Sequence, residues 1–128
     1  MEVSILVTQK DYLSNEECTL ADGKAFLEGD KLVYWEKNDN SVRNEVTFRD
    51  YVVIHRFSTY ETLIRLEEGQ GKAVVKSEMG LLKFDTKLLK YEKADDEYIV
   101  EYQLLANKEV LAHMLFKWSI KGVGYESN

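Results

Sequence analysis

The last third of the chain alternates apolar and polar side chains with the period of two that is typical of a β-strand. Between residues 110 and 120 every even position is apolar: Val110, Ala112, Met114, Phe116, Trp118 and Ile120. A helix is the alternative, because Asn107 could begin it and Gly122 could end it. On a helix, however, Phe116 and Ile120 would point away from the apolar stripe. The pattern therefore predicts a strand.

The rest of the chain divides into similar short runs rich in Val, Ile, Leu, Tyr, Phe and Thr, separated by Gly, Asn and Asp. This pattern predicts strands at about 2–8, 16–27, 31–37, 41–49, 51–57, 60–67, 72–78, 80–92, 97–106 and 109–121. Residues 80–92 also fit a partly helical segment. As a strand they require a bulge or bend near Leu88-Leu89 to keep their apolar side inward.

These runs predict an all-β fold made of neighbouring hairpins, because the gaps between them are short. Closing the sheet removes the exposed edges that so many antiparallel strands would leave. We therefore expect a single domain, residues 1–128, folded as an antiparallel up-and-down β-barrel of about 8–10 strands. Such a barrel is either filled by its own side chains or holds one small ligand.

Charge and composition narrow the range of partners. The net charge is −6 and the basic residues are spread along the chain, so we expect no nucleic-acid partner. No apolar run is long enough for a membrane span, and the N-terminus lacks the pattern of a signal peptide, so we expect no membrane partner either. Together with the single cysteine, Cys18, these features favour the cytoplasm.

No group of residues has the spacing of a catalytic or metal site. With His55, His113 and Cys18 alone, the chain has too few nitrogen and sulfur ligands for a closed zinc site. Cys18 lies among acidic residues, which do not activate a nucleophilic thiol. We therefore expect no catalytic residue, no metal and no cofactor, and we favour a non-enzymatic role.

Arg56 is the residue that the alternation marks out. It continues the parity of Val52 and Ile54, so its guanidinium is expected inside the barrel, where a charge requires a partner. One interpretation is an anchor for the head group of an amphipathic ligand. Its apolar walls would then come from Tyr34, Phe84, Tyr102, Phe116 and Trp118. The favoured alternative is structural: Arg56 pairs with an internal acid, or caps the barrel over a ring such as that of Trp118.

Several stretches resemble a known family in their order and spacing. They are KLVYWE at 31–36, VVIHRF at 52–57, ETLIRLEEG at 61–69, KSEMGLLKFDTKLL at 76–89, and the closing pair of strands beginning at Glu97. The chain thereby resembles the YwiB-like family of small bacterial proteins of unknown function. It departs from that pattern at Val75 and Ser77, where the family tends to have Tyr and Thr, and the N-terminal third matches only loosely. The resemblance implies a calycin (lipocalin-like) barrel and lends no catalytic residue.

The sequence therefore predicts a small, soluble, non-catalytic barrel that binds a small apolar or amphipathic ligand in its interior. The alternative is an interaction module that acts as a homodimer through outward residues of the last two strands, such as Leu105, Leu111 and Leu115. An enzyme that uses His55 or His113 ranks third.

Overall fold

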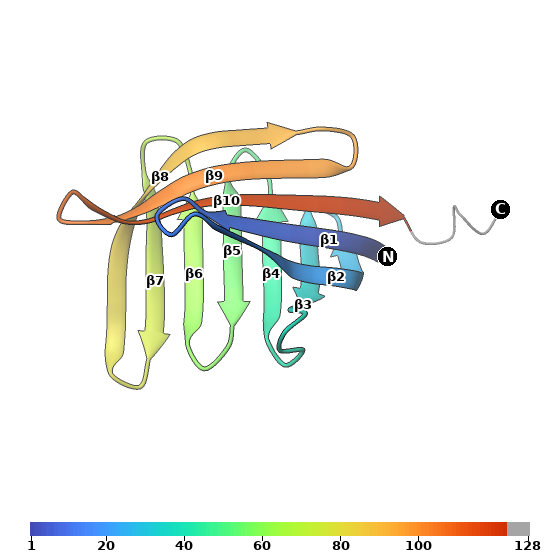
Figure 1. The fold of residues 1–128 in the computed structure, drawn as a ribbon, viewed down its shortest axis with the longest axis horizontal. Helices are drawn as coiled ribbons and strands as arrows, with labels where there is room; N and C mark the ends of the chain where they lie inside the picture. Colours follow the sequence, from blue (N-terminus) through green and yellow to red (C-terminus); the bar gives the residue numbers. More distant parts are fainter. Residues whose placement is uncertain (123–128) are drawn as a thin grey trace.

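The computed structural model describes residues 1–122; residues 123–128, which the predicted domain also includes, lie outside the described range. The described chain forms ten strands and no helix (Figure 1). The strands are β1 (Glu2–Asp11), β2 (Glu16–Glu28), β3 (Lys31–Trp35), β4 (Arg43–Phe48), β5 (Val52–Phe57), β6 (Glu61–Leu66), β7 (Gly71–Ser77), β8 (Gly80–Lys93), β9 (Glu97–Ala106) and β10 (Glu109–Gly122). Each overlaps one predicted strand, so the all-β prediction is confirmed. Nothing in residues 1–122 forms a helix that could cross a membrane.

The strands form one closed antiparallel barrel in which each strand pairs with its neighbours in sequence. Closure comes from β1, which pairs with β2 on one side and with β10 on the other. Val7, for example, lies opposite Ala21 of β2 and Trp118 of β10. The predicted up-and-down barrel is therefore correct, with ten strands.

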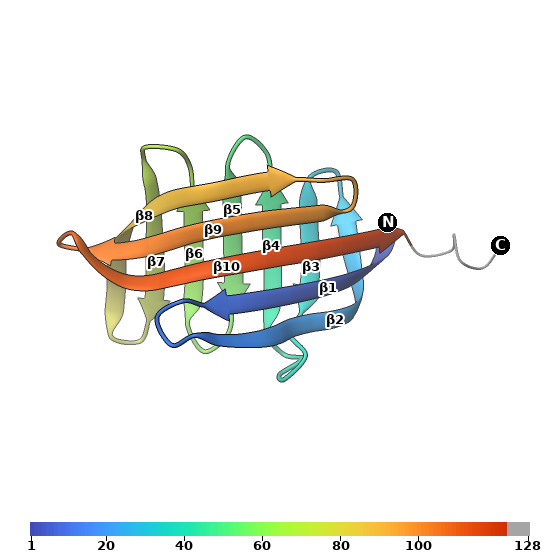
Figure 2. The ribbon, with the colours of Figure 1, turned by 45° about the horizontal axis from the view of Figure 1, so that its top comes forward.

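The barrel is flattened into two layers whose strands cross. In Figures 1 and 2, β3–β7 form the rear layer, and β9, β10 and β1 run across it in front. The long strand β8 passes from one layer to the other, and its pairing with β9 shifts between Leu88 and Lys90. This shift is the bulge predicted near Leu88-Leu89, and residues 80–92 are strand throughout. Two further shifts, at Val7/Thr8 and Val110/Ala112, were not predicted.

Alternating side chains build the core. On β4, Asn44, Val46 and Phe48 are buried and point inward, while the residues between them are half-buried on the outside. Each fully buried aliphatic side chain of this kind contributes about 1.5–3 kcal/mol to folding. The alternation in the sequence is thus the direct cause of the barrel's inside and outside.

Gly71 allows β8 to approach β6 closely at the corner of the barrel. A Cβ atom at this position would lie 1.8 Å from Thr86 Oγ1 and 2.5 Å from the carbonyl oxygen of Arg65. Thr86 instead donates a hydrogen bond of 2.9 Å to that carbonyl. Because one of the obstructing atoms is backbone, only glycine fits here without a shift of the strands.

The interior has two halves of different character. In the packed half, which lies around Phe48, Tyr98 and Trp118, aromatic rings fill the space between the layers. Phe48 stacks on Tyr98 with ring centroids 3.8 Å apart and meets Trp118 edge-on at 5.2 Å. The open half, around Arg56 and Tyr102, contains a cavity. The alternation distinguishes inside from outside, whereas the size of the inner residues decides which half is filled.

Candidate ligand-binding cavity

The open half holds a cavity of about 460 Å³ between the two layers. Its apolar walls come from both layers and include Ile54, Ile64, Tyr102, Leu104, Met114 and Phe116. The Tyr102 and Phe116 rings are nearly parallel, with centroids 6.1 Å apart. Pockets that hold small molecules commonly occupy 300–1,000 Å³ and have mainly apolar walls. The cavity therefore has the size and lining of a small-molecule site.

Arg56 lines this cavity and is paired with an internal acid. Its Nε and Nη2 donate hydrogen bonds of 2.5 and 2.9 Å to the two carboxylate oxygens of Glu36. Glu36 also accepts a hydrogen bond of 2.8 Å from Asn44 Nδ2. The Glu36 side chain is only 8% exposed, whereas that of Arg56 is 42% exposed. The fork-shaped contact and the buried carboxylate form a satisfied ion pair at the wall of the cavity.

The surroundings of this pair keep both groups charged. Burial alone would raise the pKa of Glu36, but the hydrogen bonds from Arg56 and Asn44 and the charge of Arg56 outweigh it, so the pKa lies below its usual value. Conversely, the hydrogen bond to Glu36 raises the pKa of Arg56 against its partial burial. The pair is thus ionised at neutral pH and has no net charge.

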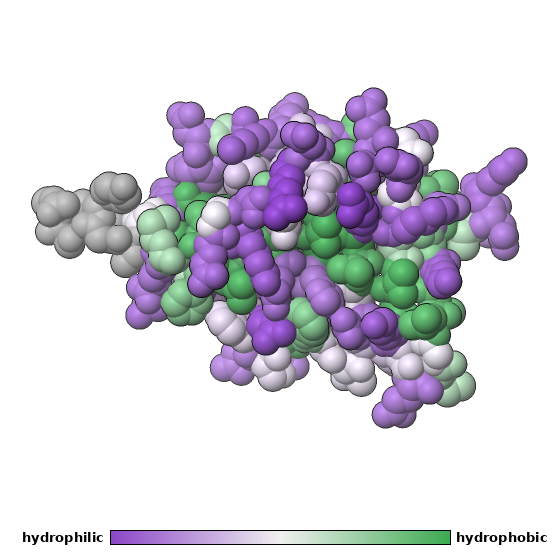
Figure 3. Space-filling model, turned by 180° about the vertical axis from the view of Figure 1, so that it is seen from behind, coloured by the Kyte–Doolittle hydropathy of each residue, from purple (hydrophilic) through white to green (hydrophobic). Residues whose placement is uncertain are grey.

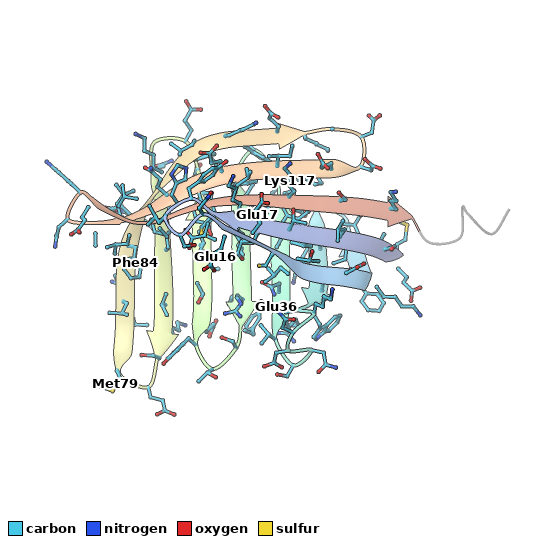
Figure 4. The ribbon with its side chains drawn as sticks, viewed as in Figure 1. Glu16, Glu17, Glu36, Met79, Phe84 and Lys117 are labelled. Carbon is cyan, nitrogen blue, oxygen red and sulfur yellow. The ribbon has the colours of Figure 1, made fainter. Side chains whose placement is uncertain are left out.

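Only some of the predicted binding residues meet at the cavity. Arg56, Tyr102 and Phe116 line it. Tyr34 and Trp118 lie instead in the packed half, fully buried, where Trp118 Nε1 donates a hydrogen bond of 3.0 Å to the Tyr34 hydroxyl. Phe84 packs against the core from β8 and is not among the residues that line the cavity; Figure 4 shows it well apart from Glu36.

Tyr102 differs from Tyr34 in its hydrogen bonding. Both phenols are buried, and desolvation raises the pKa of each far above the usual value. The Tyr34 hydroxyl accepts from Trp118, whereas the Tyr102 hydroxyl makes no hydrogen bond with any described residue and has burial as the sole cause of its shift. Among the described residues, Arg43 Nε is the one enclosed side-chain N or O atom without a hydrogen-bond partner, so the unpaired Tyr102 hydroxyl keeps access to the space at the cavity wall, where a ligand or water could bind.

Sequence reasoning missed two residues of this cluster: Glu36, which pairs with Arg56, and Asn44, which donates a hydrogen bond to Glu36. Glu36 continues the parity of buried Leu32 and Tyr34, and Asn44 continues that of Val46. The available signal was a polar residue that continues a series of inward-facing apolar residues. The same signal identified Arg56.

The two histidines each pair with a carboxylate outside the cavity. His55 Nε2 lies 2.7 Å from Glu61 Oε2, and His113 Nε2 lies 2.6 Å from Glu101 Oε2. Among residues 1–122, no three His, Cys, Asp or Glu side chains are grouped so that they could hold a metal ion. These pairs bring together no nucleophile, base and orienting group of a hydrolytic site.

Besides a hollow of about 380 Å³ at the bulge of β8, two others lie on the outer surface. One, of about 420 Å³, runs across β2, β1 and β10 and is lined by polar side chains that include Lys10, Glu17 and Lys117; the last two, labelled in Figure 4, lie on β2 and β10, on either side of β1. The other, of about 150 Å³, lies between Leu63 and Val74 on the rear layer. The rear face carries hydrophobic side chains interleaved with hydrophilic ones (Figure 3). The cavity differs from these two hollows in that its lining comes from both layers of the barrel.

The fold of the chain is similar to that of a solved bacterial protein. The crystal structure of the ywiB protein from Bacillus subtilis superposes with a TM-score of 0.67 and 15% sequence identity, over 94% of this chain and 91% of that chain. No protein-family model matches the chain. No curated protein matches it either. At this identity the likeness concerns the barrel, and it agrees with the YwiB-like fold that the sequence pattern indicates.

Proposed function

We propose that the protein is a non-catalytic barrel that binds a small apolar or amphipathic molecule in the cavity of its open half. The observation that carries this proposal is an unfilled cavity of about 460 Å³ with mainly apolar walls in a barrel whose other half is tightly packed. A protein interior is normally close-packed, and an apolar void forfeits dispersion contacts. A molecule that fills the cavity would restore those contacts. The calycin type of the barrel and its cytoplasmic location belong to the same proposal.

Mass spectrometry under native conditions tests this proposal on freshly purified protein, directly and after addition of decanol. We expect the wild-type protein to carry an additional small mass in at least one of these states. Ala112→Trp should abolish it, because Ala112 lines the cavity and the larger side chain would occupy that space. Leu111→Trp is the matched control, because the neighbouring Leu111 lies exposed on the outside. A wild-type protein that binds nothing in either state contradicts the proposal.

The homodimer alternative draws on exposed apolar residues at the start of β10. Leu111 is 46% exposed and its neighbour Val110 is also exposed, whereas Leu105 and Leu115 are half-buried. A second copy covering these residues would remove them from water. Sedimentation at increasing concentration tests it: a dimer that Leu111→Lys dissociates supports this alternative, and a monomer throughout excludes it.

An enzyme ranks third, with His55 or His113 as its acid or base. Replacing both by Ala and losing a turnover otherwise detected would favour this role; an unchanged turnover would exclude their participation.

A further inference from the structure

The charge of Arg56 is already neutralised before any ligand enters. Of the described residues that line the cavity, Arg56 alone carries a formal charge. Its Nε and Nη2 are directed at the two oxygens of Glu36. The polar wall of the cavity therefore offers a ligand a neutral ion pair rather than a free cation.

A ligand carboxylate would bind poorly beside this pair. To reach the guanidinium it would have to share it with Glu36, and two carboxylates on one guanidinium repel each other. Displacing Glu36 would leave a carboxylate that is 8% exposed without its partner, which is the costly way to break a buried pair. An ammonium group would lose its hydration beside a pair that has no net charge to compensate for it. Both signs of charge are therefore disfavoured at this wall.

The Tyr102 hydroxyl belongs to the one buried residue at the cavity wall whose polar group has no hydrogen-bond partner among the described residues; Gln9 and Thr62 also line the cavity but are only half-buried. Tyr102 is buried at the cavity wall, and its O–H makes no hydrogen bond with the described residues. Desolvation keeps the phenol protonated at all physiological pH values, so it can always donate. Phe116 lies beside it with its ring nearly parallel, and Met114 is its cross-strand neighbour on β10. A hydrogen-bond donor next to apolar walls fits an uncharged oxygen on an apolar body.

We propose that the ligand of the cavity is an uncharged amphipathic molecule, such as an alcohol or ester, whose oxygen accepts a hydrogen bond from Tyr102. This inference rests on the proposed function and specifies its ligand class. It assigns Arg56 a structural role together with Glu36 and Asn44, and it assigns the polar contact to Tyr102.

Three ligands with the same chain and different head groups test the inference: decanol, decanoate and decylammonium. Their dissociation constants at pH 7 are measured by isothermal titration calorimetry on the full chain. We expect decanol to bind about tenfold or more tightly than either ion, because burying an ion beside the occupied pair costs more than 1.4 kcal/mol, the equivalent of about tenfold.

Two tyrosine variants locate the contact. Tyr102→Phe should weaken decanol binding about two- to tenfold, the loss expected for one hydrogen bond, while it leaves the ring in place. Tyr34→Phe is the matched control: it also removes a buried hydroxyl, but one that is bonded to Trp118 and belongs to a residue that does not line the cavity. It should leave the dissociation constant of decanol unchanged. Circular dichroism of each variant verifies that the barrel is folded.

The possible results separate the inference from the proposed function. If decanoate binds more tightly than decanol and Arg56→Gln removes the difference, the cavity binds a ligand but the inference about its charge is wrong. If decanol binds equally to the wild type and to Tyr102→Phe, the inference about Tyr102 is wrong. If none of the three ligands binds, both the proposed function and this inference are wrong. If decanol binds more tightly than the two ions, and Tyr102→Phe but not Tyr34→Phe weakens its binding, the result supports both the proposed function and this inference.

Discussion

The packed half and the open half of the interior are built from the same strands with different residues. Along β10 the inner face runs from Trp118 in the packed half through Phe116 to Met114 in the open half. Along β5 it runs from fully buried Val52 through Ile54 to Arg56. The pairing of β5 with its neighbours is regular along its whole length, whereas the pairing of β10 with β9 shifts at Val110/Ala112, next to the cavity-lining Ala112. The two halves therefore differ in side-chain volume and polarity and also in the regularity of the backbone pairing.

The difference teaches how one barrel provides both stability and a binding site. In the packed half, the buried indole of Trp118 donates a hydrogen bond to the Tyr34 hydroxyl, so both groups are satisfied within the chain. In the open half, the ion pair of Arg56 and Glu36 is satisfied but the Tyr102 hydroxyl is not. We infer that the packed half carries most of the folding free energy and that the open half carries the capacity for a ligand.

Truncation of the neighbouring aromatic residues on β10 should have the largest effect on the free energy of unfolding. We expect Trp118→Ala to lower the free energy of unfolding by about 3–5 kcal/mol, because it leaves a cavity in close-packed surroundings. Phe116→Ala should cost clearly less, because one side of Phe116 already faces the cavity. Urea denaturation of both variants measures the difference. Equal losses of unfolding free energy in the two variants would mean that the two halves are packed alike, and the distinction between a packed and an open half would be wrong.

Removal of the two buried tyrosine hydroxyls should give an intermediate effect on stability. Tyr34→Phe leaves the indole N–H of Trp118 without an acceptor, so we expect the free energy of unfolding to fall by about 1–3 kcal/mol. Tyr102→Phe removes a hydroxyl that has no partner, so we expect no loss. Urea denaturation without ligand is again the measurement. A loss at Tyr102 as large as that at Tyr34 would show that its hydroxyl is satisfied in the free protein.

The barrel itself could be predicted because its signals are local. The alternation from residue 110 to 120 identified β10, and the change of parity near Leu88-Leu89 identified the bulge of β8. The shifts at Val7/Thr8 and Val110/Ala112 could not be found in this way. The residues that flank these two shifts could lie on either the inner or the outer face of the barrel. An extra residue there therefore does not visibly change the alternation of apolar and polar residues.

The cavity was only half predictable, because parity gives the face of a residue and not its depth. Arg56, Tyr102 and Phe116, which the sequence predicts to face inward, line the cavity. Tyr34 and Trp118 have the same parity signal but lie in the packed half, where they bond to each other across 84 residues of sequence. That contact depends on which strands face each other after closure, and no local pattern contains this information.

The smallest effect is expected from the ion pair at the cavity wall, and it depends on pH. Glu36→Gln should lower the free energy of unfolding at pH 7 by about 1–2 kcal/mol, less than for a fully buried pair because Arg56 is partly solvated and Gln can still accept from it.

The pKa of Glu36 is lower in the folded state than in the unfolded state. The stabilisation it provides is therefore complete above the unfolded pKa of about 4.3 and is lost as the pH falls through the folded value. Urea denaturation between pH 7 and pH 3 should show the wild-type advantage over Glu36→Gln constant down to about pH 5 and shrinking below it. An advantage that persists unchanged at pH 3 would mean that Glu36 stabilises the barrel through packing. The shape of Glu36, and not its charge, would then stabilise the polar wall of the open half.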